Sequence, residues 1–182
     1  MYWDAIQFLR AHSLTTSQSI LIICLRLAYC NPGEKIKWYT VSWPSDALSW
    51  ADFRGKVLGA TDPTTAPESS IRQSIYWNYK SLGLDTQPNT GNNGVHASAS
   101  PLEGLAERMN WLGVSLEEDN FGKALLAQGI SSETIREWVA DTQVTVQGET
   151  EAGKTMSVFD TLEDLDADTV LAKVLKIGKL SD

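Results

Sequence analysis

Apolar residues follow more than one pattern in the first part of the chain. Helical spacing of Trp3, Ile6 and Leu9 predicts a short amphipathic helix over residues 2–12. A continuous apolar run over residues 19–30 indicates a buried element. Its pattern leaves open whether that element is a helix or a strand, because periodicity does not separate the two in a short apolar run.

The middle of the chain predicts short elements separated by turns. The run IKWYTVSW (36–43) is rich in aromatic and β-branched residues, which is typical of a strand. Residues 45–59 begin with a Ser/Asp capping signal and predict a helix that ends near Gly59. Residues 70–79 fit a short helix or a strand, and the Gly/Pro/Asn-rich stretch that follows them predicts an exposed insertion.

The clearest helix signal is the tetrapeptide SPLE. Ser100 is a capping residue, Pro101 stands at the first helical position and Glu103 completes a capping box. An apolar stripe at helical spacing follows, so a helix begins here. Two further helical patterns, at 131–142 and 157–176, predict a helical and acidic C-terminal region.

Composition narrows the classes of partner. A length of 182 residues suits one domain with an extension. The net charge of −8, the pI near 4.7 and the lack of a basic patch along the sequence argue against nucleic acid as the main partner. Nucleotides stay open as ligands, because binding them needs only a few local cations.

The location of the protein follows from its apolar segments. The run at 19–30 is too short to span a bilayer and carries Arg26, so we expect no membrane association. The N-terminus has no basic region followed by an apolar core, which argues against a secretory signal. Cys24 and Cys30 lie in the apolar run and favour buried free thiols over a disulfide. We expect an intracellular, cytoplasmic protein.

One of the two histidines, His96, lies in a predicted loop of small residues just before the SPLE helix. We expect no metal at this position, because no second histidine or any cysteine lies nearby. A neutral imidazole there can act as a nucleophile if one side is accessible and a hydrogen-bonding group orients it. Ser98 and Glu107 are the candidate orienting residues, because helical side chains lean toward the N-terminus of their helix. The alternative is a turn histidine with Ser98 as a local hydrogen-bonding partner.

The segment NNGVHASASPLEGLAERMNWLG resembles the active-site segment of the nucleoside diphosphate kinases. The family pattern is asparagine, two residues, histidine, a small residue and serine, which Asn93, His96 and Ser98 match. Glu107 lies at the distance of the family's supporting glutamate, and Trp111 lies where the family has an aromatic residue.

Upstream, LGATDP is similar to the family's Leu-Gly-x-Thr-Asn-Pro, so the resemblance implies that Thr61 binds nucleotide. Arg72 follows at the spacing of a phosphate-binding arginine. The family's second arginine falls on Gly55, and the flanking Arg54 and Lys56 are the candidates for its role.

The resemblance, which covers about residues 36–113, implies a fold and a reaction. The fold is α+β, a ferredoxin-like sandwich with an antiparallel sheet, placed over residues 1–113 and followed by the helical extension 114–182. The reaction is a ping-pong transfer in which His96 takes the γ-phosphate of ATP or another nucleoside triphosphate and passes it to a diphosphate. Mg²⁺ would accompany the nucleotide, and homo-oligomers are expected by analogy.

Two other interpretations stay open. The chain lacks the family's N-terminal Lys-Pro-Asp motif and has Gly55 at the position of the second arginine, which favours a catalytically weak module for nucleotide binding or assembly. It also has Ala99 where the family has an aspartate. The string GETEAGKT (148–155) satisfies the P-loop pattern. A P-loop also needs a parallel sheet with later strands, and few residues follow Thr155, so a flexible acidic loop fits this string better.

Overall fold

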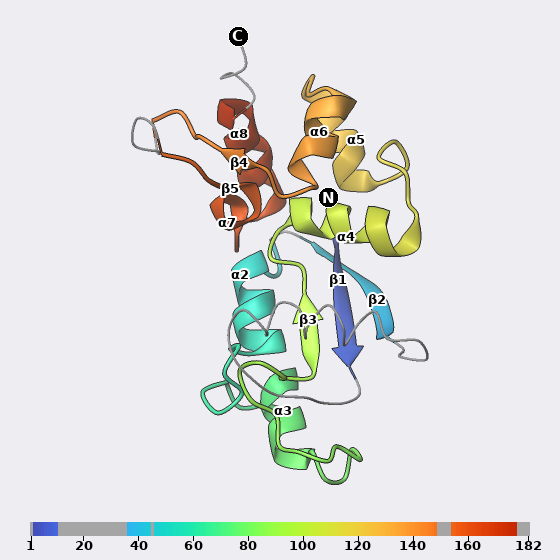
Figure 1. Cartoon of the computed structure of the whole chain (residues 1–182), viewed down its shortest axis with the longest axis vertical. Coiled ribbons are helices and arrows are strands. Elements are labelled where there is room, and N and C mark those ends of the chain that lie inside the picture. Colours follow the sequence, from blue (N-terminus) through green and yellow to red (C-terminus); the bar gives the residue numbers. More distant parts are fainter. Residues whose placement is uncertain (1, 11–35, 45, 149–153, 178–182) are drawn as a thin grey trace. The chain divides into compact units, whose positions relative to one another are not determined.

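The computed structural model describes residues 2–10, 36–44, 46–148 and 154–177. The chain is a mixed α+β protein with small antiparallel sheets and several helices (Figure 1). Contacts divide it into two compact units. Unit 1 comprises Met1–Ile6, Thr40–Asp52 and Ser98–Asp182, and unit 2 comprises Gln7–Tyr39 and Phe53–Ala97.

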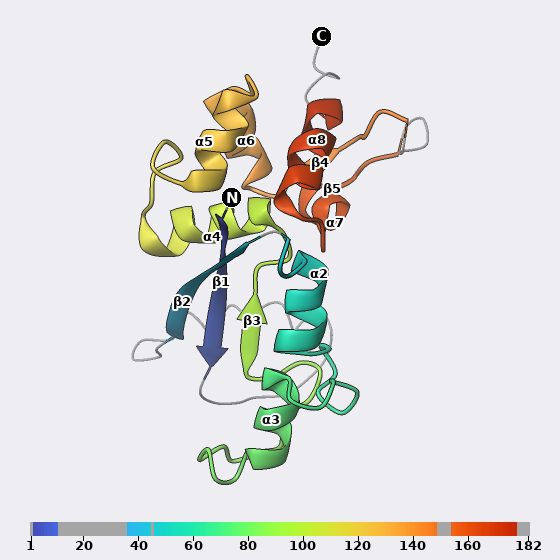
Figure 2. The same cartoon turned by 180° about the vertical axis from the view of Figure 1, so that it is seen from behind.

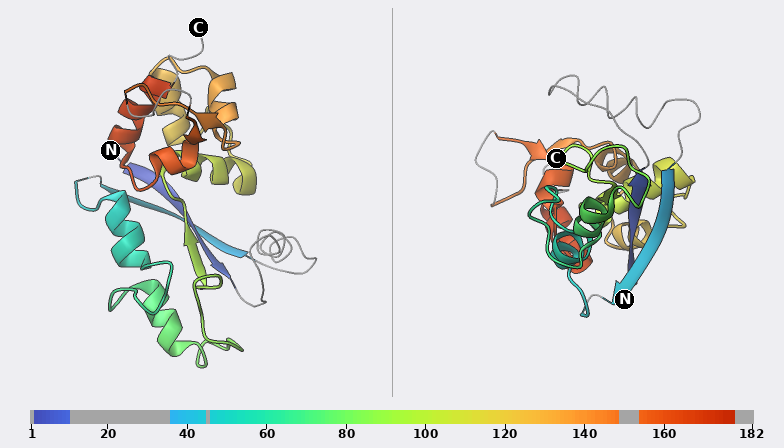
Figure 3. Two further views of the ribbon diagram at one scale, coloured as in Figure 1. Left: turned by 60° about the vertical axis from the view of Figure 1, so that its left-hand side comes forward. Right: turned by 90° about the horizontal axis from the view of Figure 1, so that it is seen from below.

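A three-stranded sheet has the order β2-β1-β3. Its strands are β1 (Tyr2–Arg10), β2 (Ile36–Pro44) and β3 (Val95–Ala97). β1 and β3 lie side by side and antiparallel, with Phe8 opposite His96 (Figure 3). The predicted strand over 36–43 is therefore confirmed.

The helix predicted over residues 2–12 is wrong, because residues 2–10 form β1. Helical spacing of apolar residues describes only the local preference of a segment. The backbone groups of this segment instead pair with β3, which is distant in the sequence, and such tertiary pairing overrides local periodicity. The apolar run over 19–30, with Cys24 and Cys30, lies outside the described residues.

Unit 2 places two short helical segments beside β3. The π-helical turn η1 (Phe53–Leu58) ends where the amide of Gly59 donates to the carbonyl of Arg54 at 3.1 Å. Gly59 has a φ of +100°, and a Cβ there would lie 2.6 Å from Ser70 Oγ, so only glycine fits this position. α3 (Ile71–Asn78) follows, capped by the Ser70 hydroxyl, so residues 70–79 are mainly a helix.

Unit 1 is mainly helical. α2 (Trp50–Asp52) is followed in the chain by η1. The helix predicted over 45–59 therefore covers residues 50–58, and its second part is π-helical. The other helices are α4 (Pro101–Leu112), α5 (Asn120–Ala127), α6 (Ser132–Trp138), α7 (Val158–Leu162) and α8 (Ala167–Ile177). β4 (Gln143–Val144) and β5 (Met156–Ser157) form an antiparallel pair (Figure 2).

α4 is central to the core of unit 1, where it packs against α5, α7 and α8. The fully buried apolar side chains of this core include Trp50, Leu102, Leu105, Phe121, Leu125, Ile135, Val158, Leu162, Val170 and Val174. The helices predicted at 131–142 and 157–176 are present. The second is divided into α7 and α8 at Asp164, which has a φ of +60°. The domain boundary expected at residue 113 stays a prediction.

Candidate functional site around Ser98 and Glu107

His96 lies at the centre of β3, within the segment that the sequence predicted as a loop. Val95 and Ala97 are 4% and 3% exposed, whereas His96 between them is half-buried. This alternation is the period of a strand, in which successive side chains point to opposite faces. The imidazole therefore lies on the face of the strand opposite to the buried side chains of Val95 and Ala97.

Ser98 and Glu107, the two predicted orienting residues, are brought together in unit 1. The Ser98 hydroxyl donates to Glu107 Oε2 at 2.5 Å. Ser98 is fully buried, and Glu107 is half-buried on the second turn of α4. Because the Glu107 side chain leans toward the N-terminus of its helix, it meets the residue that precedes that helix.

The N-terminus of α4 holds the Ser98 segment in a second way. The Ser100 hydroxyl accepts from the amide of Glu103 at 3.3 Å, as the capping box predicts. The Glu103 carboxylate accepts from the amide of Ala99. The backbone between β3 and α4 is therefore anchored to the first turn of the helix.

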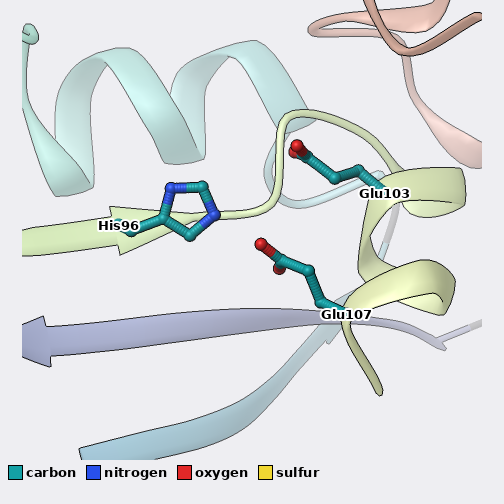
Figure 4. Close-up of side chains that lie close together, drawn as sticks. All are labelled: His96, Glu103 and Glu107. Atoms are coloured by element: carbon teal, nitrogen blue, oxygen red, sulfur yellow. The ribbon is translucent and has the colours of Figure 1, made fainter. Parts of the chain in front are cut away.

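Two carboxylates lie one turn apart at the start of α4. Glu103 and Glu107 both extend toward the segment that precedes the helix (Figure 4). Glu103 accepts a hydrogen bond from the amide of Ala99, and Glu107 accepts one from the hydroxyl of Ser98. Each carboxylate therefore helps to hold the segment that precedes α4.

The predicted phosphate-binding arginines both lie in unit 2. Arg72 on α3 donates through Nη1 to the carbonyl of Gly59 at 2.7 Å and through Nη2 to that of Val95 at 3.1 Å. Its Nε is buried without a hydrogen-bond partner in the described part of the chain. Burial lowers the pKa of Arg72, and the positive charge of Arg54 on η1 lowers it further.

The other predicted nucleotide-binding residues also lie in unit 2. Asn93 Nδ2 donates to the carbonyl of Thr61 at 3.1 Å, which joins two of them. The side chains of Thr61 and Lys56 are exposed. The P-loop string is only partly described, because residues 149–153 lie outside the described ranges.

Sequence reasoning missed two residues that hold the Ser98 segment. Trp50 contacts this segment directly, and Asp166 contacts Trp50. Trp50 Nε1 donates to the carbonyl of Ser98 at 2.9 Å, and Asp166 Oδ1 accepts from the amide of Trp50 at 2.6 Å. No local signal reveals these contacts, because 116 positions separate Asp166 from Trp50 in the sequence. Trp50 is buried, whereas Val57 of the same predicted helix is 41% exposed.

Comparison of the chain with protein-family models, with curated proteins and with solved structures gave no match. Within the described ranges, no helix is both long enough and apolar enough to cross a membrane.

Proposed function

We propose that this chain is a nucleoside diphosphate kinase-like phosphotransferase in which His96 carries the phosphate. The observation that supports this most is the hydrogen bond of 2.5 Å between the Ser98 hydroxyl and Glu107 Oε2. Both residues were predicted to serve the histidine, which precedes Ser98 by two positions. A nucleophile of this kind needs an accessible ring and a neighbouring polar group in a fixed orientation.

In the first half-reaction, an imidazole nitrogen of His96 attacks the γ-phosphorus of a nucleoside triphosphate. A nitrogen–phosphorus bond forms, and the bond from the γ-phosphorus to the bridging oxygen breaks. The diphosphate leaves with that electron pair. In the second half-reaction, a terminal oxygen of another nucleoside diphosphate attacks the phosphorus, and the imidazole leaves with the electron pair of its bond.

The arginine pair of unit 2 favours an anionic ligand. Burial lowers the pKa of Arg72, and the positive charge of Arg54 lowers it further because the two cations repel one another. A phosphate group would relieve this repulsion, and its charge is what phosphoryl transfer must stabilise. In this proposal Arg72 and Thr61 hold the phosphates, Arg54 or Lys56 supplies the second cation, and Asn93 binds the sugar or a phosphate.

The proposal also covers the metal ion, the cell compartment and the oligomeric state of the enzyme. Mg²⁺ would enter bound to the nucleotide and would neutralise phosphate charge, as it does in phosphoryl transfer generally. The chain acts in the cytoplasm and self-associates, as symmetric assembly is common among soluble enzymes.

A second candidate is a nucleotide-binding or assembly module with weak catalysis. One observation favours it, namely that Arg72 already donates to the carbonyls of Gly59 and Val95. A guanidinium that holds two backbone segments together has fewer donors left for a phosphate. Such a module would bind nucleotide without becoming phosphorylated.

The test is incubation of the purified chain with γ-labelled ATP and Mg²⁺, followed by measurement of acid-labile, base-stable protein phosphate. We expect label on the wild type and none on His96→Asn. His12→Asn is the matched control, because His12 is the only other histidine in the sequence, and it should keep the label. Equal labelling of the wild type and His96→Asn contradicts the proposal.

Nucleotide affinity separates the remaining alternatives. If the chain is a binding module, the wild type should bind ATP without taking up the phosphate label. The P-loop interpretation predicts that Lys154→Ala abolishes binding while His96→Asn leaves it intact. The phosphotransferase predicts that Lys154→Ala changes neither binding nor labelling.

A further inference from the structure

The C-terminal segment contacts the backbone that carries Ser98 through a buried tryptophan. Asp166, just before α8, accepts the amide of Trp50 at 2.6 Å. The Trp50 indole Nε1 then donates to the carbonyl of Ser98 at 2.9 Å. Trp50 is 1% exposed, and its ring packs against Trp43 with centroids 5.3 Å apart, so the indole is held firmly.

The next carbonyl in the same segment is fixed from the same region. The amide of Asp164 donates to the carbonyl of Ala99 at 2.9 Å. Ser98 and Ala99 thus each have a backbone carbonyl bound by a donor from outside the β3–α4 connection. Because a peptide group is planar, these bonds fix the two peptide planes that follow Ser98, which limits the backbone rotation that sets the direction of its side chain.

We infer that Trp50 and Asp166 are positioning residues of the proposed phosphotransfer site and act through Ser98, which makes the segment around α8 a part of that site. This inference rests on the proposed function. Trp50 fixes the Ser98 carbonyl, and the Ser98 hydroxyl is thereby kept on Glu107. Asp166 acts one step earlier, by fixing the amide at the start of the helix that carries Trp50.

Substitutions can separate this role from simple packing. Trp50→Phe removes the indole N–H and also some ring volume. Trp138→Phe is the matched control. Trp138 is 3% exposed in the core of the same unit, and its substitution removes the same side-chain volume. Asp166→Ala removes the acceptor for the Trp50 amide, whereas Asp166→Asn keeps an oxygen at that position and should restore wild-type behaviour. Asp168→Ala, at an exposed position in the first turn of α8, controls for loss of charge.

The experiment measures the single-turnover rate of His96 phosphorylation by γ-labelled ATP, together with ATP affinity. We expect Trp50→Phe and Asp166→Ala to slow phosphorylation by about tenfold or more at unchanged affinity, since small misplacements of a reacting group are costly. In a Ser98→Ala background, Trp50→Phe should cause no further loss. Equal slowing by Trp138→Phe, or additive losses in the double variant, overturns the inference while the proposed function stands.

Hydrogen exchange of the Ala99 amide gives a second measurement that needs no nucleotide. This amide donates to Glu103 within the positioned segment. Exchange should quicken about tenfold in Trp50→Phe and stay near the wild-type rate in Trp138→Phe. If the wild type takes up no label, the proposed function fails, and this exchange decides whether Trp50 holds the Ser98 segment. Unchanged exchange in Trp50→Phe overturns that claim.

Discussion

The ion pair between Arg108 and Asp119 should dominate the stability of unit 1. Arg108 Nε donates to Asp119 Oδ2 at 2.6 Å, and Nη2 donates to Oδ1 at 3.1 Å. The two side chains are only 5% and 2% exposed. Asp119 also caps α5, because its Oδ1 accepts the amides of Phe121 and Gly122 at 2.8 and 3.0 Å. This pair fixes α4, the helix that presents Glu107.

The substitution Asp119→Ala removes two contributions at once. Loss of the helix cap costs about 1 kcal/mol of the free energy of unfolding. Loss of the carboxylate leaves the Arg108 guanidinium buried without a counter-charge, which costs about 3–5 kcal/mol. The expected total of about 4–6 kcal/mol is comparable with the whole stability of many domains, about 5–15 kcal/mol.

Two controls distinguish a buried charge from a simple loss of contacts. The double variant Arg108→Met/Asp119→Ser removes both charges and keeps a capping hydroxyl, so it should cost less than about 2 kcal/mol. The surface pair of Arg136 and Glu117 is 3.8 Å apart and more than half exposed, so Arg136→Ala should cost less than about 1 kcal/mol.

Guanidinium denaturation followed by tryptophan fluorescence measures these free energies, because Trp50 and Trp138 are buried in this unit. The reasoning is refuted if Asp119→Ala costs no more than Arg136→Ala. It is also refuted if the double variant is as unstable as Asp119→Ala, since the uncompensated charge would then not be the cause.

Three further outcomes are expected from denaturation experiments. Gly122→Ala should destabilise the fold by about 1–3 kcal/mol, because the added Cβ would lie 2.2 Å from the carbonyl oxygen of Leu116. Asp164→Val should cost about 1–2 kcal/mol because its φ is +60°, whereas Asp164→Gly should cost nothing or stabilise. Hydrogen bonds from the hydroxyl and amide of Ser115 lower the pKa of Glu118. The Glu118 carboxylate therefore stabilises the fold above its ordinary pKa, and this stabilisation is lost as the pH falls through the lowered pKa. Glu118→Gln should make the free energy of unfolding less dependent on pH below about 4.5. An unchanged acid limb in Glu118→Gln would contradict that assignment.

The local features of the site could be predicted from the sequence. The SPLE signal placed the start of α4 correctly, and the Ser100 cap is present. The lean of helical side chains toward the N-terminus predicted that Glu107 points back toward the segment before the helix, and in the structure Glu107 accepts a hydrogen bond from Ser98 of that segment. Both results depend on geometry within a few turns of one helix, and such geometry follows from the spacing of residues.

Other roles could not be predicted from spacing. Arg72 stands at the position expected of a phosphate ligand, yet its guanidinium also joins the carbonyls of Gly59 and Val95. Those carbonyls are identical to every other carbonyl in the sequence, and only the folded backbone brings them to one side chain. Whether Arg72 also binds phosphate stays a prediction.

The sequence by itself determined the helix that follows the histidine, its cap and the direction of Glu107 toward the segment before that helix, because each depends on neighbours in the chain. Only the tertiary structure decided that residues 2–10 are a strand and that Trp50 and Asp166 support the Ser98 segment. A strand gains its hydrogen bonds from a distant partner, and a buried indole gains its acceptor from whichever segment packs beside it. Interactions of this kind depend on the whole fold, so no local pattern of residues announces them.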